Sequence, residues 1–541
     1  SMPKQAGARR IGLYMERFVA YKDERWSWPA LPDTVPQFIS ALQSVSVKDV
    51  QPKQQYSIFP SASVTQDQID GKTNYRAGAD FFWRPSTNLQ LTATINPDFG
   101  VAESDDVVIN LSATETFFPE KRLFFLEGQD VFTASPRADT RGAGVGNRGA
   151  PYTLVNTRRI GGKPVLPVLG AGESARTKDQ IQPNDLLGAV KVTGQNGQIR
   201  YGVLAAFEDD PEFLVQGAQG ARRVVGSGSE YGVARILFED QPGGAYKSFG
   251  ALSTMVLNES GDALVQSLDG HYLGENGKFK ADAQVFTSDK DGVDRGFGGF
   301  VDFEYAFRQG VTQRLGIEYF DDAVDVSDLG FLQRNDNFRI RQAHTRTRSD
   351  LSWARSNQLD IRGYVQKNSE DLFTQGGLFV SNQSVLNNLS QVVFRLDLLA
   401  ASYDDLNSFG NGAYRVEARQ MASIGWASNR SKPLSFGGKL GYQGEELGGD
   451  SAVYSLYATW RPDDRLVLDL MFNYLDRSGW LLHSRDRTMG TFDAEQWAPG
   501  IGVEYFISAK QQLKFVVQWV GVKARARDAY GILDAPGHLQ R

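Results

Sequence analysis

The 541-residue sequence predicts an all-β protein: a large antiparallel transmembrane β-barrel of about 22 or more strands, with an inward-folded, plug-like insertion. Three observations predict this fold. Apolar and polar residues alternate in segments of about ten residues, short turns separate these segments, and the sequence contains no apolar run long enough to cross a membrane as a helix.

The alternation is clearest in residues 465–474, where Leu466, Leu468, Leu470, Phe472 and Tyr474 occupy every second position. A period of two places them on one face of a strand and their neighbours on the other. Similar segments recur from residue 55 to residue 524, so the repeating unit is a hairpin. The mean hydropathy of -0.37 agrees with a barrel, because its lumen, turns and outer loops are polar.

Short turns assign the direction of the strands. Residues 83–89 and 460–466 share one pattern, in which Trp-Arg-Pro ends one strand and Leu begins the next. Similar short links occur at residues 194–197, 275–277 and 508–511. Outer-membrane barrels have short periplasmic turns and long extracellular loops, so we expect these turns on the periplasmic side.

The alternation and the turns together predict a continuous series of strands. Their ranges are 55–65, 73–84, 88–96, 185–194, 198–207, 229–238, 246–257, 262–273, 278–287, 297–307, 312–321, 336–348, 358–367, 371–384, 388–402, 412–427, 432–444, 451–461, 464–476, 498–507 and 511–524. The total is odd, whereas bacterial single-chain barrels have even numbers. We therefore expect either a miscounted strand or the loss of one or more closing strands from the sequence.

Charged residues alternate with the apolar ones, which predicts a polar inner wall. Val301, Phe303 and Tyr305 alternate with Asp302 and Glu304. A wide, hydrated lumen follows. The basic residues between 339 and 348 alternate less regularly. Arg339 and Arg341 would lie on one face of a strand, whereas Arg346 and Arg348 would lie on the opposite face. For these residues, with His344, we expect a solvated upper rim.

Two regions interrupt the pattern and define the organisation of the chain. Residues 1–50 lack clean alternation and are expected to be a periplasmic lead-in, while residues 51–541 form the barrel. Residues 97–184 form its longest connection, and connections of this length are usually functional. Strand parity places both ends of this insertion on the outer side. We expect it to fold into the lumen as a plug.

Composition excludes several classes of function. The sequence has no cysteine, which excludes disulfides, thiolate metal sites and cysteine nucleophiles. The net charge of -6 and the scattered Lys and Arg residues give no reason to expect nucleic acid as a partner. Ser1-Met2 resembles an expression remnant, so we expect the targeting segment of an exported barrel to have been removed.

The most distinctive stretch of the insertion is rich in phenylalanine. Within residues 117–125 lie Phe117, Phe118, Phe124 and Phe125, and the charged residues beside them are Glu120, Lys121, Arg122 and Glu127. The rings need a packed niche, and the charges need partners or water. We expect a small hydrophobic core that anchors the plug to the wall. The alternative is a sugar-stacking or constriction surface.

The same stretch carries a resemblance. The FFPEKR-x-FFLEG motif at residues 117–128, the Arg158-Arg159-Ile160-Gly161 sequence and residues 329–336 resemble a family of uncharacterised outer-membrane β-barrels. The resemblance implies a barrel that usually follows a periplasmic, family-9-like carbohydrate-binding domain, and residues 12–28 are similar to the tail of that domain. It therefore implies a link to carbohydrate, but no catalytic residues.

A basic run follows the phenylalanine-rich stretch. Its members are Arg137, Arg141, Arg148, Arg158, Arg159 and Lys163, against the single acid Asp139. Such a run either pairs with acidic lumen walls or selects an anionic solute. Arg158 and Arg159, which belong to the family-like motif, are the candidates for anion selection.

Other motifs give weaker signals. Residues 144–149 match a dinucleotide-binding fingerprint by letters but lack the strand and helix that it needs, so we expect a flexible loop. Asp289, Asp291 and Asp294 resemble part of a calcium loop without its downstream glutamate. No G-x-S-x-G sequence accompanies the four histidines, and His483 with Ser484 is expected in a long loop. We expect no enzymatic activity, no cofactor and no metal beyond that weak calcium candidate.

The sequence thus predicts a protein of the bacterial outer membrane, in contact with its lipid and lipopolysaccharide. The expected function is passage of a polar, carbohydrate-related solute or polymer through a plugged lumen. The alternative is a non-transport barrel that anchors or displays a periplasmic or surface partner. In either case a periplasmic carbohydrate-binding domain is a candidate partner.

Overall fold

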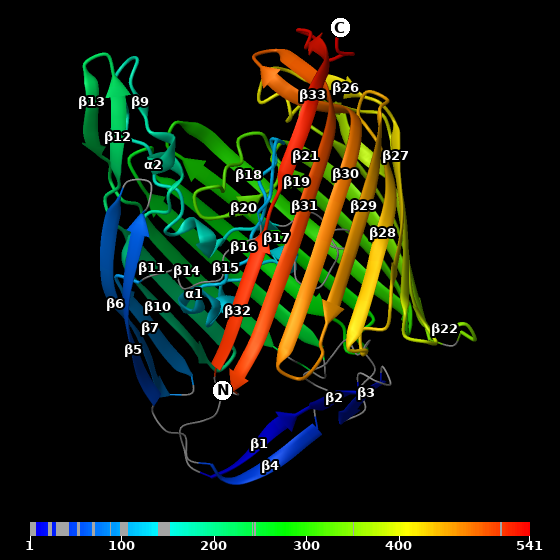
Figure 1. Cartoon of the computed structure of the whole chain (residues 1–541). Coiled ribbons are helices and arrows are strands. Elements are labelled where there is room, and N and C mark those ends of the chain that lie inside the picture. The colour runs from blue at the N-terminus through cyan, green and yellow to red at the C-terminus, as the bar shows by residue number, and fades with distance from the viewer. Residues whose placement is uncertain are drawn as a thin grey trace.

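A computed structural model shows one closed barrel of 22 strands, in which every paired register is antiparallel (Figure 1). The structure describes residues 7–19, 24–28, 43–50, 55–67, 71–86, 88–97, 107–138, 152–240, 242, 245–349, 351–508 and 511–541. In these ranges, no helix has the length and apolarity needed to cross a membrane. The predicted all-β barrel is confirmed.

The wall is built by strands that follow one another along the chain. Its first half contains β5 (Gln55–Asp67), β6 (Lys72–Ser86), β7 (Leu89–Ile95), β10 (Leu186–Asn196), β11 (Ile199–Glu208), β14 (Glu230–Asp240), β15 (Tyr246–Leu257), β16 (Ala263–Leu273), β17 (Phe279–Lys290), β18 (Val293–Arg308) and β19 (Val311–Phe320). Its second half contains β21 (Asn337–Arg348), β22 (Ala354–Lys367), β23 (Phe373–Leu386), β24 (Gln391–Leu399), β27 (Arg419–Ala427), β28 (Leu434–Gly444), β29 (Asp450–Trp460), β30 (Leu466–Arg485), β31 (Thr488–Ser508), β32 (Gln511–Gln518) and β33 (Gly521–Gly531).

The last two strands are collinear. β32 pairs with residues 500–508 of β31, and β33 pairs with residues 488–497 of the same strand. β32 and β33 therefore share a single position beside β31, so the wall has one position fewer than its 22 strands. The number of positions is odd, as is the total of strands expected from the sequence. Since each pairing from β5 to β33 is antiparallel, the strands that meet where the barrel closes, β33 and β5, run in the same direction.

Alternation separates the two faces of the wall. On β14, Tyr231, Val233 and Arg235 are buried on the inner face, whereas Ile236 and Phe238 are exposed on the outer face. An outward band of apolar side chains is the surface that lipid requires. The inward arginine shows that the inner face accepts charge, as the sequence predicted.

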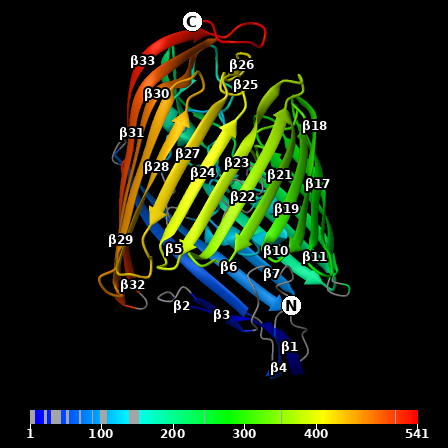
Figure 2. The ribbon, with the colours of Figure 1, turned by 90° about the vertical axis from the view of Figure 1, so that its right-hand side faces the viewer.

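Shorter elements extend from both ends of the wall (Figures 1 and 2). At the N-terminal end, β1 (Gly7–Leu13) pairs with β4 (Gln43–Val50), and β2 (Met15–Val19) pairs with β3 (Glu24–Trp28). At the opposite end, β9 (Ser174–Ala175), β12 (Glu212–Gly217) and β13 (Gly220–Val225) form a small sheet, and β25 (Ser402–Asp404) pairs with β26 (Tyr414–Val416). The described parts of residues 1–50 are thus strands outside the barrel.

The insertion packs against the inner face of the barrel (Figure 1). It contains α1 (Leu123–Leu126), η2 (Gln129–Val131), η3 (Pro136–Ala138), β8 (Tyr152–Thr153), η4 (Thr157–Arg159) and α2 (Thr177–Ile181), and β8 pairs with β20 (Phe331–Leu332). Phe125, Phe132 and Tyr152 share one buried cluster with the inward-facing Leu204 and Phe300 of the wall. Its inward packing is observed, whereas closure of the lumen stays a prediction.

Gly202 of β11 gives a direct test of this packing. A Cβ atom at Gly202 would lie 2.8 Å from the Phe132 ring and 2.9 Å from the Val131 side chain, both in the insertion. We expect Gly202→Ala to lower the local stability of residues 129–135 by about 1–3 kcal/mol through overpacking, measured by amide hydrogen exchange. The control is Gly232→Ala, where the nearest atom is 3.8 Å away. Equal exchange in the two variants would contradict the packing.

Two loop predictions are wrong. Residues 477–497 were expected to be a loop with His483, but β30 and β31 continue through them as a long hairpin. The register shifts between Ser478 and Trp480, around Gly479 with φ of 85°, and this bulge changes the phase of the alternation. Residues 209–228 also contain the unexpected β12–β13 hairpin, and the predicted strand 412–427 divides into β26 and β27.

Candidate functional site in the barrel interior

The phenylalanine-rich stretch forms part of the core between the insertion and the wall. Phe124 and Phe125 on α1 are buried, and the Phe117 ring makes an edge contact with Phe331 at 4.9 Å. Phe118 and Lys121 are half-buried. Glu127 pairs with Arg84 of β6, and its backbone carbonyl accepts a hydrogen bond from Lys191 of β10. These contacts favour the anchoring interpretation over an open stacking surface.

Glu120 and Arg122 form a buried ion pair beside this core. Their side chains are 3% and 6% exposed, and two hydrogen bonds of 2.9 and 2.8 Å join the Arg122 guanidinium to the Glu120 carboxylate. Arg122 also donates to the Thr157 and Ile160 carbonyls, and the Thr157 hydroxyl donates to Glu120 at 2.6 Å. The pair therefore fastens α1 to η4 within the insertion.

The insertion should loosen in acid because of Glu120. Burial by itself raises the pKa of this carboxyl, but the hydrogen bond and charge of Arg122 and the hydrogen bond from Thr157 outweigh burial and lower it below 4.5. The stabilisation is present above pH 4.5 and is lost as the pH falls through the lower, folded-state pKa. We expect amide exchange of residues 123–126 to become faster in this acid range. The part of this increase that comes from protonation of Glu120 should be absent from the Glu120→Gln variant. An identical acid response in the variant would assign it to other groups.

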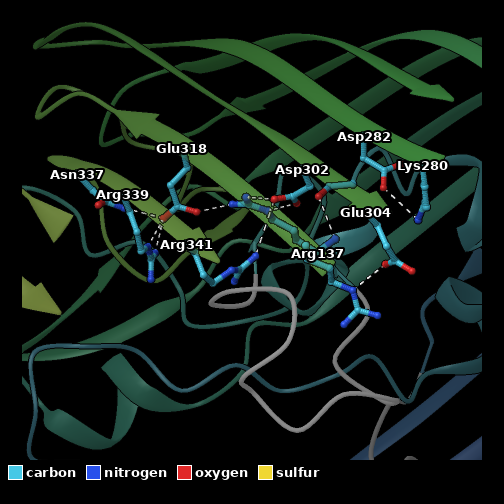
Figure 3. A network of polar contacts seen from close by, with 11 residues as sticks. Arg137, Lys280, Asp282, Asp302, Glu304, Glu318, Asn337, Arg339 and Arg341 are labelled. Atoms are coloured by element: carbon cyan, nitrogen blue, oxygen red, sulfur yellow. Dashed lines mark hydrogen bonds and ion pairs between the residues drawn. The ribbon is translucent and has the colours of Figure 1, made fainter. Parts of the chain in front are cut away.

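Arg137 connects the insertion to the wall (Figure 3). Its side chain is 3% exposed and donates two hydrogen bonds of 2.7 Å to Asp302 of β18, and it also pairs with Glu318 of β19. The guanidinium lies 4.1 Å from the centre of the Phe300 ring. Two carboxylates and one ring thus hold a single cation of the insertion. For Arg137, the interpretation that the basic run pairs with acidic walls is confirmed.

The same network corrects the prediction for Arg339 and Arg341. Their side chains are 16% and 13% exposed rather than on a solvated rim. Arg339 pairs with Glu318, and Arg341 lies 3.8 Å from Asp302 (Figure 3). Their partners lie on the nearby strands β18 and β19, and Arg137 of the insertion contacts the same carboxylates, which a single strand's alternation cannot reveal. Glu318 was not identified from the sequence, and its only signal there is its inward phase on β19.

The two arginines proposed for anion selection lie on η4. Arg159 donates hydrogen bonds of 2.8 and 2.6 Å to Glu115 and one of 3.2 Å to the Gly330 carbonyl. Its charge is therefore matched within the insertion. Arg158 is half-buried at the adjacent position. Selection of anions by these residues stays a prediction. Arg141, Arg148, Asp139 and the glycine loop 144–149 lie outside the described residues.

A polar cavity of about 820 Å³ lies in the interior beside the insertion. Inward side chains of β21–β24 line it, including Arg362, Arg395, Asp397, Gln383, Tyr364 and Phe379. The Tyr364 and Phe379 rings stack at 5.3 Å with an angle of 6° between their planes. In the described part of the chain, the buried Nε of Arg362 has no hydrogen-bond partner. The cavity thus combines an aromatic face, amides and a free donor, which suit a polar, hydroxyl-bearing solute.

The weaker candidates are not brought together into reactive or metal sites. Asp289 pairs with Arg295, and the Asp291 carboxylate accepts a hydrogen bond of 3.1 Å from the Asp262 amide. No group of three or more His, Asp or Glu among the described residues, Asp294 included, could hold a metal ion. His483 contacts the Asp486 carbonyl at 2.7 Å instead of Ser484. His271 lies between Asp269 and Asp282, at 3.1 and 2.7 Å.

The chain is similar in fold to solved outer-membrane proteins and in sequence to one protein family. Two solved barrels from Pseudomonas aeruginosa resemble the chain. OpdQ is 10% identical in sequence, and the superposition has a TM-score of 0.33. It covers 64% of this chain and 94% of the OpdQ chain. A mutant of the ferric enterobactin receptor PfeA, solved in complex with enterobactin, is 9% identical in sequence, with a TM-score of 0.42. The superposition covers 86% of this chain and 75% of the PfeA chain. No curated protein matches. Residues 53–541 match the family described as Domain of unknown function (DUF5916), and the chain belongs to that family.

Proposed function

We propose that this barrel lies in the bacterial outer membrane and passes a polar solute through its lumen, with residues 97–184 as the plug. One observation carries the proposal: a polar cavity of about 820 Å³ lies between the inner wall and an insertion that contacts the wall through both an apolar cluster and ion pairs. The insertion therefore leaves part of the polar lumen open.

The solute is proposed to be carbohydrate-related. The family resemblance supports this part, and the stacked Tyr364 and Phe379 rings beside Gln383 are chemically suited to a sugar. A periplasmic carbohydrate-binding domain, as the resemblance implies, would deliver or receive the solute. Outer-membrane lipid and lipopolysaccharide are the proposed surroundings of the outward apolar band.

Solute flux into liposomes tests this proposal. We expect the chain lacking residues 117–128 to admit small neutral sugars, because this deletion removes α1 and the Glu120–Arg122 pair that supports it. In that background, Ser381→Trp should lower the flux, since Ser381 lines the cavity. Leu378→Trp is the matched control, because Leu378 is exposed on the outer face of the same strand.

The competing function is a non-transport barrel that anchors or displays a partner. It requires the insertion to close the lumen permanently or to leave no continuous path. Sugar flux equal to that of protein-free liposomes after the deletion would contradict transport and favour this second function. Equal flux in the Ser381→Trp and Leu378→Trp variants would show that the sugar does not pass through the polar cavity.

A further inference from the structure

A second, apolar cavity of about 690 Å³ lies inside the barrel between α1 and the first two wall strands. Phe59 of β5 and Phe82 of β6 form one side, with ring centres 5.7 Å apart at an angle of 78°. Leu123 and Leu126 of α1 form the other side. This apolar cleft is distinct from the polar cavity, which the arginines of β21–β24 line.

The cleft exposes apolar side chains within an otherwise polar lumen. Leu123 is 79% exposed and Phe59 is 56% exposed, although both point toward the inside of the barrel. Leu123 contrasts with Phe124 and Phe125 on the same helix, which are buried in the core. Water against these surfaces is unfavourable, so the cleft favours an apolar occupant. Its volume is in the range of small-molecule sites.

The polar groups of the cleft lie mainly at one end. The register of β5 and β6 places Gln55 opposite Arg84 at the turn between β6 and β7, and Ser57 opposite Phe82 in the next inward position. Arg84 is 48% exposed and pairs with Glu127 of the insertion. Asp80 lies opposite Phe59 at the other end. An occupant with one polar head and one apolar tail matches a polar end, which carries Gln55 and the Arg84–Glu127 ion pair, and two phenyl rings.

The cleft borders the place where the barrel closes. β5 is next to β33 in the strand order of the barrel, and it pairs with β6 in an antiparallel register on its other side. Residues on both faces of β5 are exposed, and seven of the eight residues of β32 are exposed. In the described part of the chain, the closing strands are therefore the least covered part of the wall.

We propose that the cleft holds one acyl chain of a membrane phospholipid, which enters between β33 and β5. The lipid is the occupant because the outward side chains of the same strands, such as Tyr56 and Ile58, are exposed apolar groups at the membrane surface. An acyl chain that enters between β33 and β5 reaches Phe59 directly, because Phe59 lies on the inner face of β5. This inference rests on the proposed location in the outer membrane, but it does not depend on passage of a solute.

Photo-crosslinking in nanodiscs tests the inference with the full chain. The probe is a phosphatidylcholine with a diazirine in its acyl chain, and a parallel sample contains diazirine-bearing free palmitic acid. Mass spectrometry then locates the label. We expect the phospholipid to label Leu123 and Leu126, in addition to outward residues such as Ile58, which bulk lipid labels in any case. Label confined to outward residues would overturn the inference, as would labelling of Leu123 by the free fatty acid alone.

A matched pair of variants makes the test specific. Phe59→Asn and Ile58→Asn place the same amide on neighbouring exposed residues of β5, one inward and one outward. We expect Phe59→Asn to lower phospholipid labelling of α1 by about tenfold, because the cleft then carries an unpaired amide. Ile58→Asn should leave labelling of α1 unchanged. Equal labelling of α1 in the two variants would overturn the assignment of the cleft, and amide exchange of β14 serves as the folding control.

Discussion

Replacing Arg122 by methionine should lower the local stability of the insertion by about 3–5 kcal/mol, since it leaves the Glu120 carboxylate buried without its cation. Both side chains are almost fully buried, and Arg122 also donates to the carbonyls of Thr157 in η4 and of Ile160 directly after it. The change therefore removes the connection between α1 and η4. Hydrogen exchange of the amides of residues 123–126 measures this local opening.

Two controls separate loss of the ion pair from loss of any positive charge. Lys121→Met makes the same change in charge at the adjacent, half-buried position and should have a smaller effect. The double variant Glu120→Leu, Arg122→Met removes both charges and should recover much of the stability, because no unpaired charge stays buried. Equal exchange in Arg122→Met and Lys121→Met would show that the pair does not hold the insertion together.

Arg137→Met should detach the insertion locally from the wall. The variant leaves Asp302 and Glu318 without the cation that bridges them, although Glu318 keeps Arg339 and a hydrogen bond of 2.8 Å from Asn337. Truncating one partner of a buried charge pair costs at least about 2 kcal/mol. We expect faster amide exchange in residues 131–138 and more frequent openings in planar-bilayer recordings, because this contact joins the insertion to β18 and β19.

Arg314→Met provides the matched control for this prediction. Arg314 pairs with Glu304 at 2.7 Å on the same pair of wall strands, but the two side chains are 28% and 35% exposed. A partly solvated pair within the wall contributes roughly 0–1 kcal/mol. The control should leave the insertion in place. Openings that are equally frequent in Arg137→Met and Arg314→Met would argue against Arg137 as the contact that holds the insertion.

Much of the barrel wall could be predicted from sequence because its information is local. In residues 466–474, alternation alone places Leu470 and Phe472 on the outer face, where both are exposed. The turns at residues 194–197 and 275–277 could be identified for the same reason. The prediction failed at Gly479, where a bulge shifts the phase by one residue and converts an apparent loop into the β30–β31 hairpin.

The contacts inside the lumen could be predicted only in part. Composition showed that Phe124 and Phe125 need a core and that the basic run needs acids. It could not show that Arg137 pairs with Glu318, which is 181 residues away. Burial of Arg339 depends on the insertion and on a neighbouring strand, so its sequence position suggested a solvated rim instead. The polar cavity brings together residues from several strands, and alternation within one strand carries no information about their proximity.

We propose that the insertion closes a lumen that would otherwise conduct ions. Single-channel conductance in planar bilayers tests this claim most directly, by comparing the full chain with the chain lacking residues 117–128. We predict a closed or rarely open full chain and a stable, open pore after the deletion. A folded barrel that stays non-conducting after the deletion would contradict the claim.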